Sequence, residues 1–159
     1  MAKKTGMEWA DEKARAIING NKYMVLATAG KDGKPWGCVL NYVHDDEYNF
    51  YFLSSQKSEH MRQIKHEPVV FMVIYDSHCT KEEQDEVQIR GMARPVTQEE
   101  LLNVIEKYDV SPYIKKHAVV EDFIGNSEVK FMRVTVLDAY TLDTRDEPGR
   151  RKRLHVKLA

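Results

Sequence analysis

Three serines, a lysine and a histidine lie within one short segment and could together bind an anion. Ser54 and Ser55 end an apolar, aromatic run, and Ser58 follows, flanked by Lys57 and His60. Hydroxyl and ammonium groups donate hydrogen bonds, and a helix beginning at Ser58 would add free backbone N–H groups, so the segment suits a phosphate. The same residues also describe an ordinary helix capped by a serine, and spacing alone favours that simpler interpretation.

Other reactive side chains are isolated in the sequence and indicate no particular chemistry. Cys38 lies within an apolar run, where a small core side chain is the simplest interpretation. His78 and Cys79 are adjacent in a polar loop, but no second pair of ligands stands at a suitable spacing, so no metal site is expected. His44 and Asp45 fit a solvated turn. No Gly-x-Ser-x-Gly pattern is present, and we assign no catalytic residue.

The chain that must position these residues has 159 residues and a mass of 18.5 kDa, which suits a single domain. Its 42% hydrophobic and 31% charged residues are typical of a soluble globular protein. No apolar run reaches the roughly 20 residues that span a bilayer, so no membrane segment is expected. Two cysteines, far apart, argue against a disulfide framework and favour the cytoplasm.

Alternating and apolar segments predict a mainly β fold with short helices at its periphery. An Asp-Gly pair at 32–33 between two apolar runs predicts a hairpin, and Thr97 with Glu100 forms a capping box that begins a helix. Six strands joined mostly by short turns indicate a small antiparallel barrel or sandwich. The expected strands are 23–29, 35–43, 48–54, 69–75, 87–96 and 129–142, and the expected helices are 7–19, 58–66 and one after 97.

The segment 69–75 is apolar at every position. A strand that is buried on one face only should alternate between apolar and polar residues. We therefore expect a helix or a second subunit to cover its outer side.

The order of these segments resembles the pyridoxamine 5'-phosphate oxidase-like family of FMN-binding split barrels. The resemblance covers roughly residues 12–105, with weaker agreement to about 142, and rests on segments 23–28, 32–36, 50–55, 58–60 and 87–91. It implies a six-stranded antiparallel split β-barrel with Greek-key topology and short flanking helices. It also implies a homodimer that binds FMN in a groove between its subunits.

In this family the second strand, the third strand and the next helix start hold the flavin, together with a polar residue on the fifth strand, here Glu86 or Gln88. The family's oxidase has an arginine where Cys38 stands and an Arg-Lys pair where Glu59 and His60 stand, so two cations that hold the phosphate are replaced. Lys57 and His60 are expected to compensate in part. The implied cofactor-binding residues are Cys38, Val39, Leu40, Asn41, Leu53, Ser54, Ser55, Lys57, Ser58, His60 and Gln88.

The resemblance therefore implies an FMN-dependent oxidoreductase that acts on an unidentified small substrate, with the flavin supplying the redox chemistry. Genuine pyridoxamine 5'-phosphate oxidase activity is not expected, because of these departures. One alternative is a non-catalytic, stress-related protein of the same fold that binds a flavin, the deazaflavin F420 or haem. Another is an interaction module whose groove holds no cofactor.

We expect residues 1–143 to form the FMN-binding split-barrel domain that the resemblance implies, and residues 144–159 to form a basic tail or an edge strand beyond it. Residues 145–157 contain six cationic and two anionic side chains, a net +4 within a chain whose total is −1. Nucleic acid could bind such a cluster, but a solvated tail, or an edge strand through Leu154, Val156 and Leu158, is the simpler interpretation. A further hypothesis is that the tail crosses to the partner subunit and supplies cations to its FMN phosphate.

Overall fold

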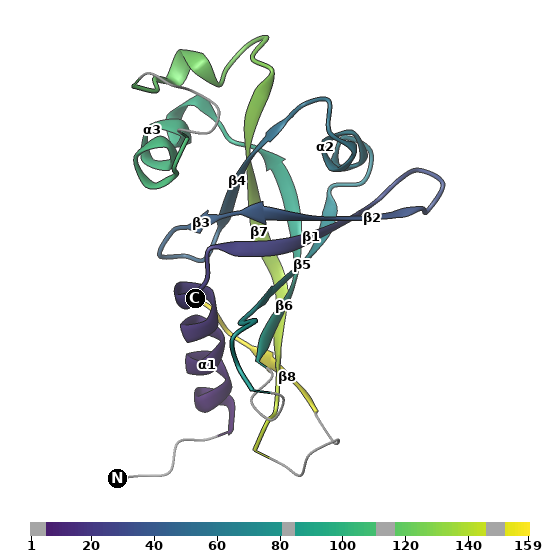
Figure 1. Ribbon diagram of the computed structural model, residues 1–159, viewed down its shortest axis with the longest axis vertical. Coiled ribbons are helices and arrows are strands. Elements are labelled where there is room, and N and C mark those ends of the chain that lie inside the picture. The colour runs from purple at the N-terminus through teal and green to yellow at the C-terminus, as the bar shows by residue number, and fades with distance from the viewer. Residues whose placement is uncertain (1–5, 81–84, 111–116, 146–151) are drawn as a thin grey trace.

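The computed structural model describes residues 6–80, 85–110, 117–145 and 152–159. Its strands form one antiparallel sheet that curls into a half-barrel, with helices around it (Figure 1). The strand order is β2-β1-β5-β6-β7-β4-β3, and β8 pairs with β7. The strands are β1 (Tyr23–Ala29), β2 (Pro35–Asn41), β3 (Val43–His44), β4 (Phe50–Ser55), β5 (Val69–Tyr75), β6 (Glu86–Pro95), β7 (Val129–Leu142) and β8 (Arg153–Val156), and the helices are α1 (Gly6–Gly20), α2 (Glu59–Ile64), α3 (Gln98–Lys107) and the 3-10 turn η1 (Val120–Asp122).

The mainly β, antiparallel fold is confirmed, but the prediction of six strands is wrong, since the described residues contain eight. The expected strand 35–43 is divided into β2 and β3 at Tyr42. This side chain is buried, and its hydroxyl donates a hydrogen bond to the carbonyl of Ile18 in α1 (2.7 Å). The eighth strand, β8, comes from the segment expected as a basic tail. None of the helices within the described ranges has the length and apolar character needed to cross a membrane.

Two glycines have local roles in this sheet. Gly33 has a positive φ of 75° and forms the predicted hairpin turn between β1 and β2, where a side chain would be strained. Gly91 lies where the register of β6 and β7 shifts. A Cβ at Gly91 would lie only 2.3 Å from Val134 Cγ1 and 3.0 Å from the Thr135 carbonyl oxygen, so these strands approach too closely for any side chain there.

Strand β4 is buried on both faces and separates two hydrophobic clusters. Phe50 and Phe52 point into the main core, which α1 closes, whereas Tyr51 and Leu53 point to a second cluster beneath α3. The capping box predicted for α3 is present, and its Glu100 also receives hydrogen bonds from two arginines of the sheet, as described below. Helix α3 is thereby attached to the sheet by both apolar packing and ion pairs.

The described end of the tail belongs to the sheet of its own chain. Strand β8 pairs with the end of β7, and Val156 and Leu158 are 3% and 6% exposed in the main core. Arg15 of α1 donates a hydrogen bond to the Lys157 carbonyl (3.1 Å), and the Lys157 N–H donates one to Asp11 (2.8 Å). Residues 146–151, which include two of the tail's arginines, lie outside the described residues.

Four neighbouring strands present apolar side chains to solvent on the convex side of the sheet. The pairing registers place Val39, Val25 and Val73 side by side across β2, β1 and β5. Within the described chain the side of β5 that the sequence predicted to be covered remains exposed, with Phe71 at 37% and Tyr75 at 51%. We call this surface the outer face, and define it by Tyr23, Val25, Val39, Val69, Phe71, Val73, Tyr75 and Met92.

Candidate functional site

His60 is the centre of a polar cluster that joins β2, the end of β4 and helix α2. Its side chain is 6% exposed. The ring nitrogen Nδ1 lies 3.4 Å from Cys38 Sγ, and Nε2 lies 2.7 Å from Ser54 Oγ and 3.1 Å from Ser58 Oγ. We call these four residues the His60 cluster. All four are among the residues that the sequence predicted for cofactor binding.

The hydrogen bonds of the His60 cluster assign its protons. The Ser58 hydroxyl donates its one hydrogen to the Ser55 carbonyl (2.7 Å), so it can only accept from His60. A hydrogen on Nε2 serves both serines, and Nδ1 is then free to accept one from the Cys38 thiol. Burial lowers the pKa of His60 and raises the pKa of Cys38, which favours the same neutral imidazole and neutral thiol. The cluster is therefore uncharged and its polar groups satisfy one another.

This arrangement changes the role expected for Ser58. Ser58 is the N-cap residue of α2, as the sequence predicted, but its side chain makes no hydrogen bond to a helix N–H. Its hydrogen is given to the Ser55 carbonyl instead, so the hydroxyl closes the loop before α2 rather than the helix itself.

Three cations near α2 all have carboxylate partners. Lys57 Nζ lies 3.0 Å from Glu128 Oε1, with both side chains about 80% exposed. Arg62 bonds Glu59 within α2, and Lys34 of the β1–β2 hairpin bonds an aspartate two residues before it. Lys34 and Arg62 also line a shallow pocket between the hairpin and α2, and so does Lys31. Exposed pairs of this kind contribute little energy, and none of these cations bonds a side chain of the His60 cluster.

The remaining predicted residues lie elsewhere, because alternate residues of β2 point to opposite sides of the sheet. Val39 and Asn41 point to the outer face, and so does Gln88, which is aligned with Val39 three strands away, or roughly 14 Å. Leu40 packs against the main core, and Leu53, at 1% exposure, packs beneath α3. Only the backbones of these two leucines could contact a ligand.

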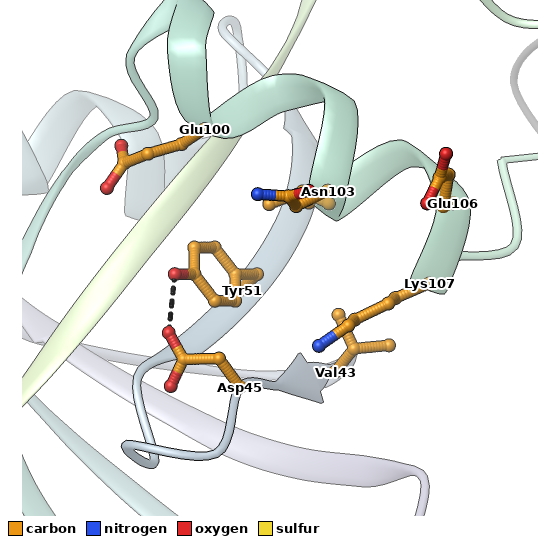
Figure 2. A pocket seen from close by; sticks show the side chains of 8 residues that line it. Val43, Asp45, Tyr51, Glu100, Asn103, Glu106 and Lys107 are labelled. Atoms are coloured by element: carbon orange, nitrogen blue, oxygen red, sulfur yellow. Dashed lines mark hydrogen bonds between the residues drawn. The ribbon is translucent and has the colours of Figure 1, made fainter.

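A polar pocket of about 220 Å³ lies between α3 and the start of β4 (Figure 2), and the sequence did not predict it. Tyr51 donates a hydrogen bond to Asp45 (2.8 Å), and Asn103 and Lys107 of α3 face this pair across the pocket. Burial and the Asp45 carboxylate raise the pKa of Tyr51 to about 12, so its phenol stays protonated. We call this cavity the α3 pocket.

Two carboxylates fix the walls of the α3 pocket. Asp45 accepts hydrogen bonds from the Asn49 N–H (2.9 Å) and side chain (2.8 Å), so the turn expected to be merely solvated is an ordered support for Tyr51. Glu100 accepts hydrogen bonds from Arg94 and Arg133 (2.6 Å each), and the Arg94 guanidinium holds the pKa of Glu100 well below its usual range. An aspartate that begins a turn was the available sequence signal.

The residues present fit only part of FMN, the cofactor that the resemblance implies. A flat ring suits the exposed backbone of β2, where Gly37 leaves open space: no atom lies within 4 Å of a Cβ built there. The phosphate does not fit the His60 cluster, because the cluster carries no cation and its hydrogens are committed internally. The structure is therefore compatible with a flavin ring and disagrees with a phosphate held at these residues.

Comparisons with solved structures show the same fold in proteins of low sequence identity. A haem-binding protein from Mycobacterium smegmatis superposes with a TM-score of 0.70 at 18% identity, over 98% of this chain and 60% of that one. General Stress Protein 26 from Bacillus anthracis gives 0.65 at 20% identity, over 92% and 98%. The haem storage protein HutZ from Vibrio cholerae gives 0.60 at 17% identity, over 77% and 86%.

Sequence comparison assigns the family directly. This chain spans only 60% of the length of the mycobacterial protein, and no curated protein matches it in sequence. A family model described as pyridoxamine 5'-phosphate oxidase, however, matches residues 10–143, which include every strand except β8. The chain belongs to the pyridoxamine 5'-phosphate oxidase family.

Proposed function

We propose that the protein is a homodimer that binds the ring of a flavin on its outer face and uses it to oxidise or reduce a small molecule. The observation that carries this proposal is the outer face itself, on which Tyr23 and Val39 are 61% and 65% exposed. Soluble monomers rarely expose a contiguous apolar surface of this kind. A second copy of the chain would cover it and explain why β5 is apolar at every position.

The positions of Val39 and Gln88 support a site shared between two chains. Within one chain they lie about 14 Å apart on the outer face, with Val25 and Val73 between them. In a dimer, Gln88 of one protomer can approach a ring that lies against Val39 of the other. A flavin bound there would supply hydride or electron transfer, while β2 and Asn41 would orient its ring.

The α3 pocket is our proposal for the site of the small substrate. The Tyr108 hydroxyl donates a hydrogen bond to the carbonyl of Asn41 (3.2 Å), and Val43, two residues further on, lines the pocket. The pocket therefore adjoins the end of the strand on which the ring would lie. Its amide and ammonium groups, from Asn103 and Lys107, would bind a polar molecule.

Reconstitution tests this function. The purified protein is titrated with lumiflavin, riboflavin, FMN and F420 while flavin fluorescence is followed, and its mass is measured by light scattering during gel filtration. We expect a dimer that binds the flavins, and weaker binding by about tenfold or more in Gly37→Val, which adds bulk to β2 without a clash in the free protein. A monomer, or a protein that binds no flavin, would contradict the proposal.

Haem is a second candidate, and one observation favours it. A pocket of about 300 Å³ on the outer face is lined by Tyr23, Val39, Tyr75 and His78, and His78 Nδ1 lies 3.5 Å from an Asp76 carboxylate oxygen. A carboxylate beside one ring nitrogen commonly orients a histidine that binds a metal through the other. His78 is therefore the residue that would bind the iron of a haem at this surface.

Titration with haemin separates the two candidates. Haem binding at His78 should produce a Soret band that is lost in His78→Ala and kept in His66→Ala, a variant of an exposed histidine near α2. The absence of a Soret band would leave the flavin as the sole candidate, and a band that is unchanged in His78→Ala would show that haem binds through a residue other than His78.

A further inference from the structure

The His60 cluster occupies the place where the resemblance would put the phosphate of the cofactor, yet its hydrogen bonds form a closed chain. The Cys38 thiol donates to His60 Nδ1, His60 Nε2–H donates to Ser54 and Ser58, and Ser58 donates to the Ser55 carbonyl. Ser54 Oγ lies 3.3 Å from Ser58 Oγ, so its hydrogen also has an acceptor within the cluster. The side-chain hydrogens of these four residues therefore all have acceptors within the described structure, and none is left to donate to an external anion.

The two departures from the family pattern meet in this chain. Cys38 stands where the family's oxidase has an arginine, and His60 stands where it has a lysine; here the two side chains contact each other, 3.4 Å apart. They replace two cations with one neutral hydrogen bond. The Cys38 thiol has no cationic form, and His60, which is 6% exposed, could become a cation only by protonation of Nδ1, which would break that bond.

The charges around the cluster do not replace the missing cations. Glu59, the first residue of α2, places a carboxylate beside His60 in the sequence and is already bonded to Arg62. Lys57 extends away to Glu128 and is 81% exposed, where water screens its charge. A dianion at the cluster would lose its hydration and gain no fixed positive charge, whereas hydroxyl groups lose much less when they are buried.

We infer that this site accepts a flavin whose side chain ends in hydroxyl groups, of the riboflavin type, in preference to the corresponding phosphate monoester. The inference rests on the flavin binding proposed above and concerns only the end of the ligand that lies near the His60 cluster. The ring lies against β2, the end strand of the sheet, and the polyol passes round the edge of this strand to the partly exposed Cys38 on its other side, where the uncharged cluster forms a neutral wall.

The test compares three flavins that share one ring. Lumiflavin has no polar side chain, riboflavin ends in a hydroxyl group and FMN ends in a phosphate, so their dissociation constants separate the ring, the polyol and the phosphate. We expect riboflavin to bind more tightly than lumiflavin and at least as tightly as FMN, with little change on addition of salt. An FMN affinity that exceeds that of riboflavin by tenfold or more, and falls with salt, would overturn the inference and leave the proposed flavin function intact. Binding of none of the three would overturn both.

Variants of the His60 cluster test whether its lack of charge sets the preference for riboflavin over FMN. Cys38→Arg and His60→Lys return a cation to the cluster, and either should raise FMN affinity by about tenfold or more while riboflavin affinity changes little. Lys65→Ala, in which an exposed lysine at the far end of α2 is removed, should leave both affinities unchanged. Circular dichroism first confirms which variants are folded. Where both cationic variants unfold, the wild-type comparison decides alone, and a strong loss of FMN affinity in Lys57→Ala would show that the phosphate is bound after all.

Discussion

Substitution of Val73 by glutamate tests the dimer most directly. Val73 lies in the middle of the outer face, between Val25 on one neighbouring strand and Gln88 on the other. Its side chain points away from the core, and Arg90, a cation on the same side of the adjacent strand, is already paired with Asp138 (2.8 Å). A carboxylate at position 73 would therefore be tolerated in water and unpaired in an interface.

The expected magnitude follows from that position. An uncompensated charge in a buried interface costs about 3–5 kcal/mol, and each 1.4 kcal/mol is about tenfold in a dissociation constant. Val73→Glu should thus weaken dimerisation at least about a hundredfold, and more if both copies of residue 73 are buried. The monomer should lose only about 1 kcal/mol or less, because the side chain is directed outward.

Sedimentation equilibrium over a range of protein concentrations measures the dissociation constant, and circular dichroism checks the fold. The matched control is Leu102→Glu, since Leu102 is 64% exposed on α3 and lies outside the outer face. Leu102→Glu should behave as the wild type. A Val73→Glu protein that keeps the wild-type dissociation constant, or a wild-type protein that is monomeric throughout, would refute the reasoning.

Three further substitutions test other parts of the structure. Gly91→Ala should lower the free energy of unfolding by about 1–3 kcal/mol, because the new Cβ would lie 2.3 Å from a side-chain carbon. Gly20→Ala, where no atom lies within 4 Å of the new Cβ, should not lower it, and chemical denaturation measures both variants. Glu100→Gln should cost about 1–3 kcal/mol at neutral pH, and its deficit should shrink as the pH falls below about 4, because the unfolded wild-type chain then takes up a proton that folded Glu100 does not bind. A carboxyl group whose pKa is lowered by folding stabilises the folded state at pH values above its unfolded pKa, and this stabilisation is lost as the pH falls toward its folded pKa. Glu99→Gln, which removes an exposed carboxylate, should show no such dependence on pH. Leu158→Ala should cost about 2–5 kcal/mol, as expected for a side chain that is 6% exposed, and thermal unfolding indistinguishable from the wild type would contradict its place in the core.

The sequence was sufficient for features that depend on local pattern. The Asp-Gly pair requires a positive φ and therefore placed the β1–β2 hairpin, and the capping box of Thr97 and Glu100 placed the start of α3. The uniformly apolar segment 69–75 correctly indicated a strand, but not whether its outer side would be covered within the chain. That depends on tertiary packing, which local pattern does not contain.

The sequence was insufficient where the outcome depended on which side chains meet. Nothing local distinguishes Cys38 as the hydrogen-bond partner of a histidine 22 residues away, so the neutral character of the His60 cluster could not be predicted. The division of the second strand likewise depends on Tyr42, whose hydroxyl reaches a carbonyl in α1. The α3 pocket was missed because its other wall, formed by Asn103 and Lys107, meets Asp45 and Tyr51 only when α3 packs over the start of β4.

The contact between α1 and the segment after β8 has a consequence for folding kinetics. Arg15 and Asp11 of α1 form hydrogen bonds with Lys157, so residues more than 140 positions apart must come together before α1 and the segment after β8 are fixed in place. Contacts of such long range are slow to form, because the chain entropy of closing the loop is lost before the contact is gained. We therefore expect α1 and β8 to be protected from hydrogen exchange together and late during refolding, as one cooperative unit.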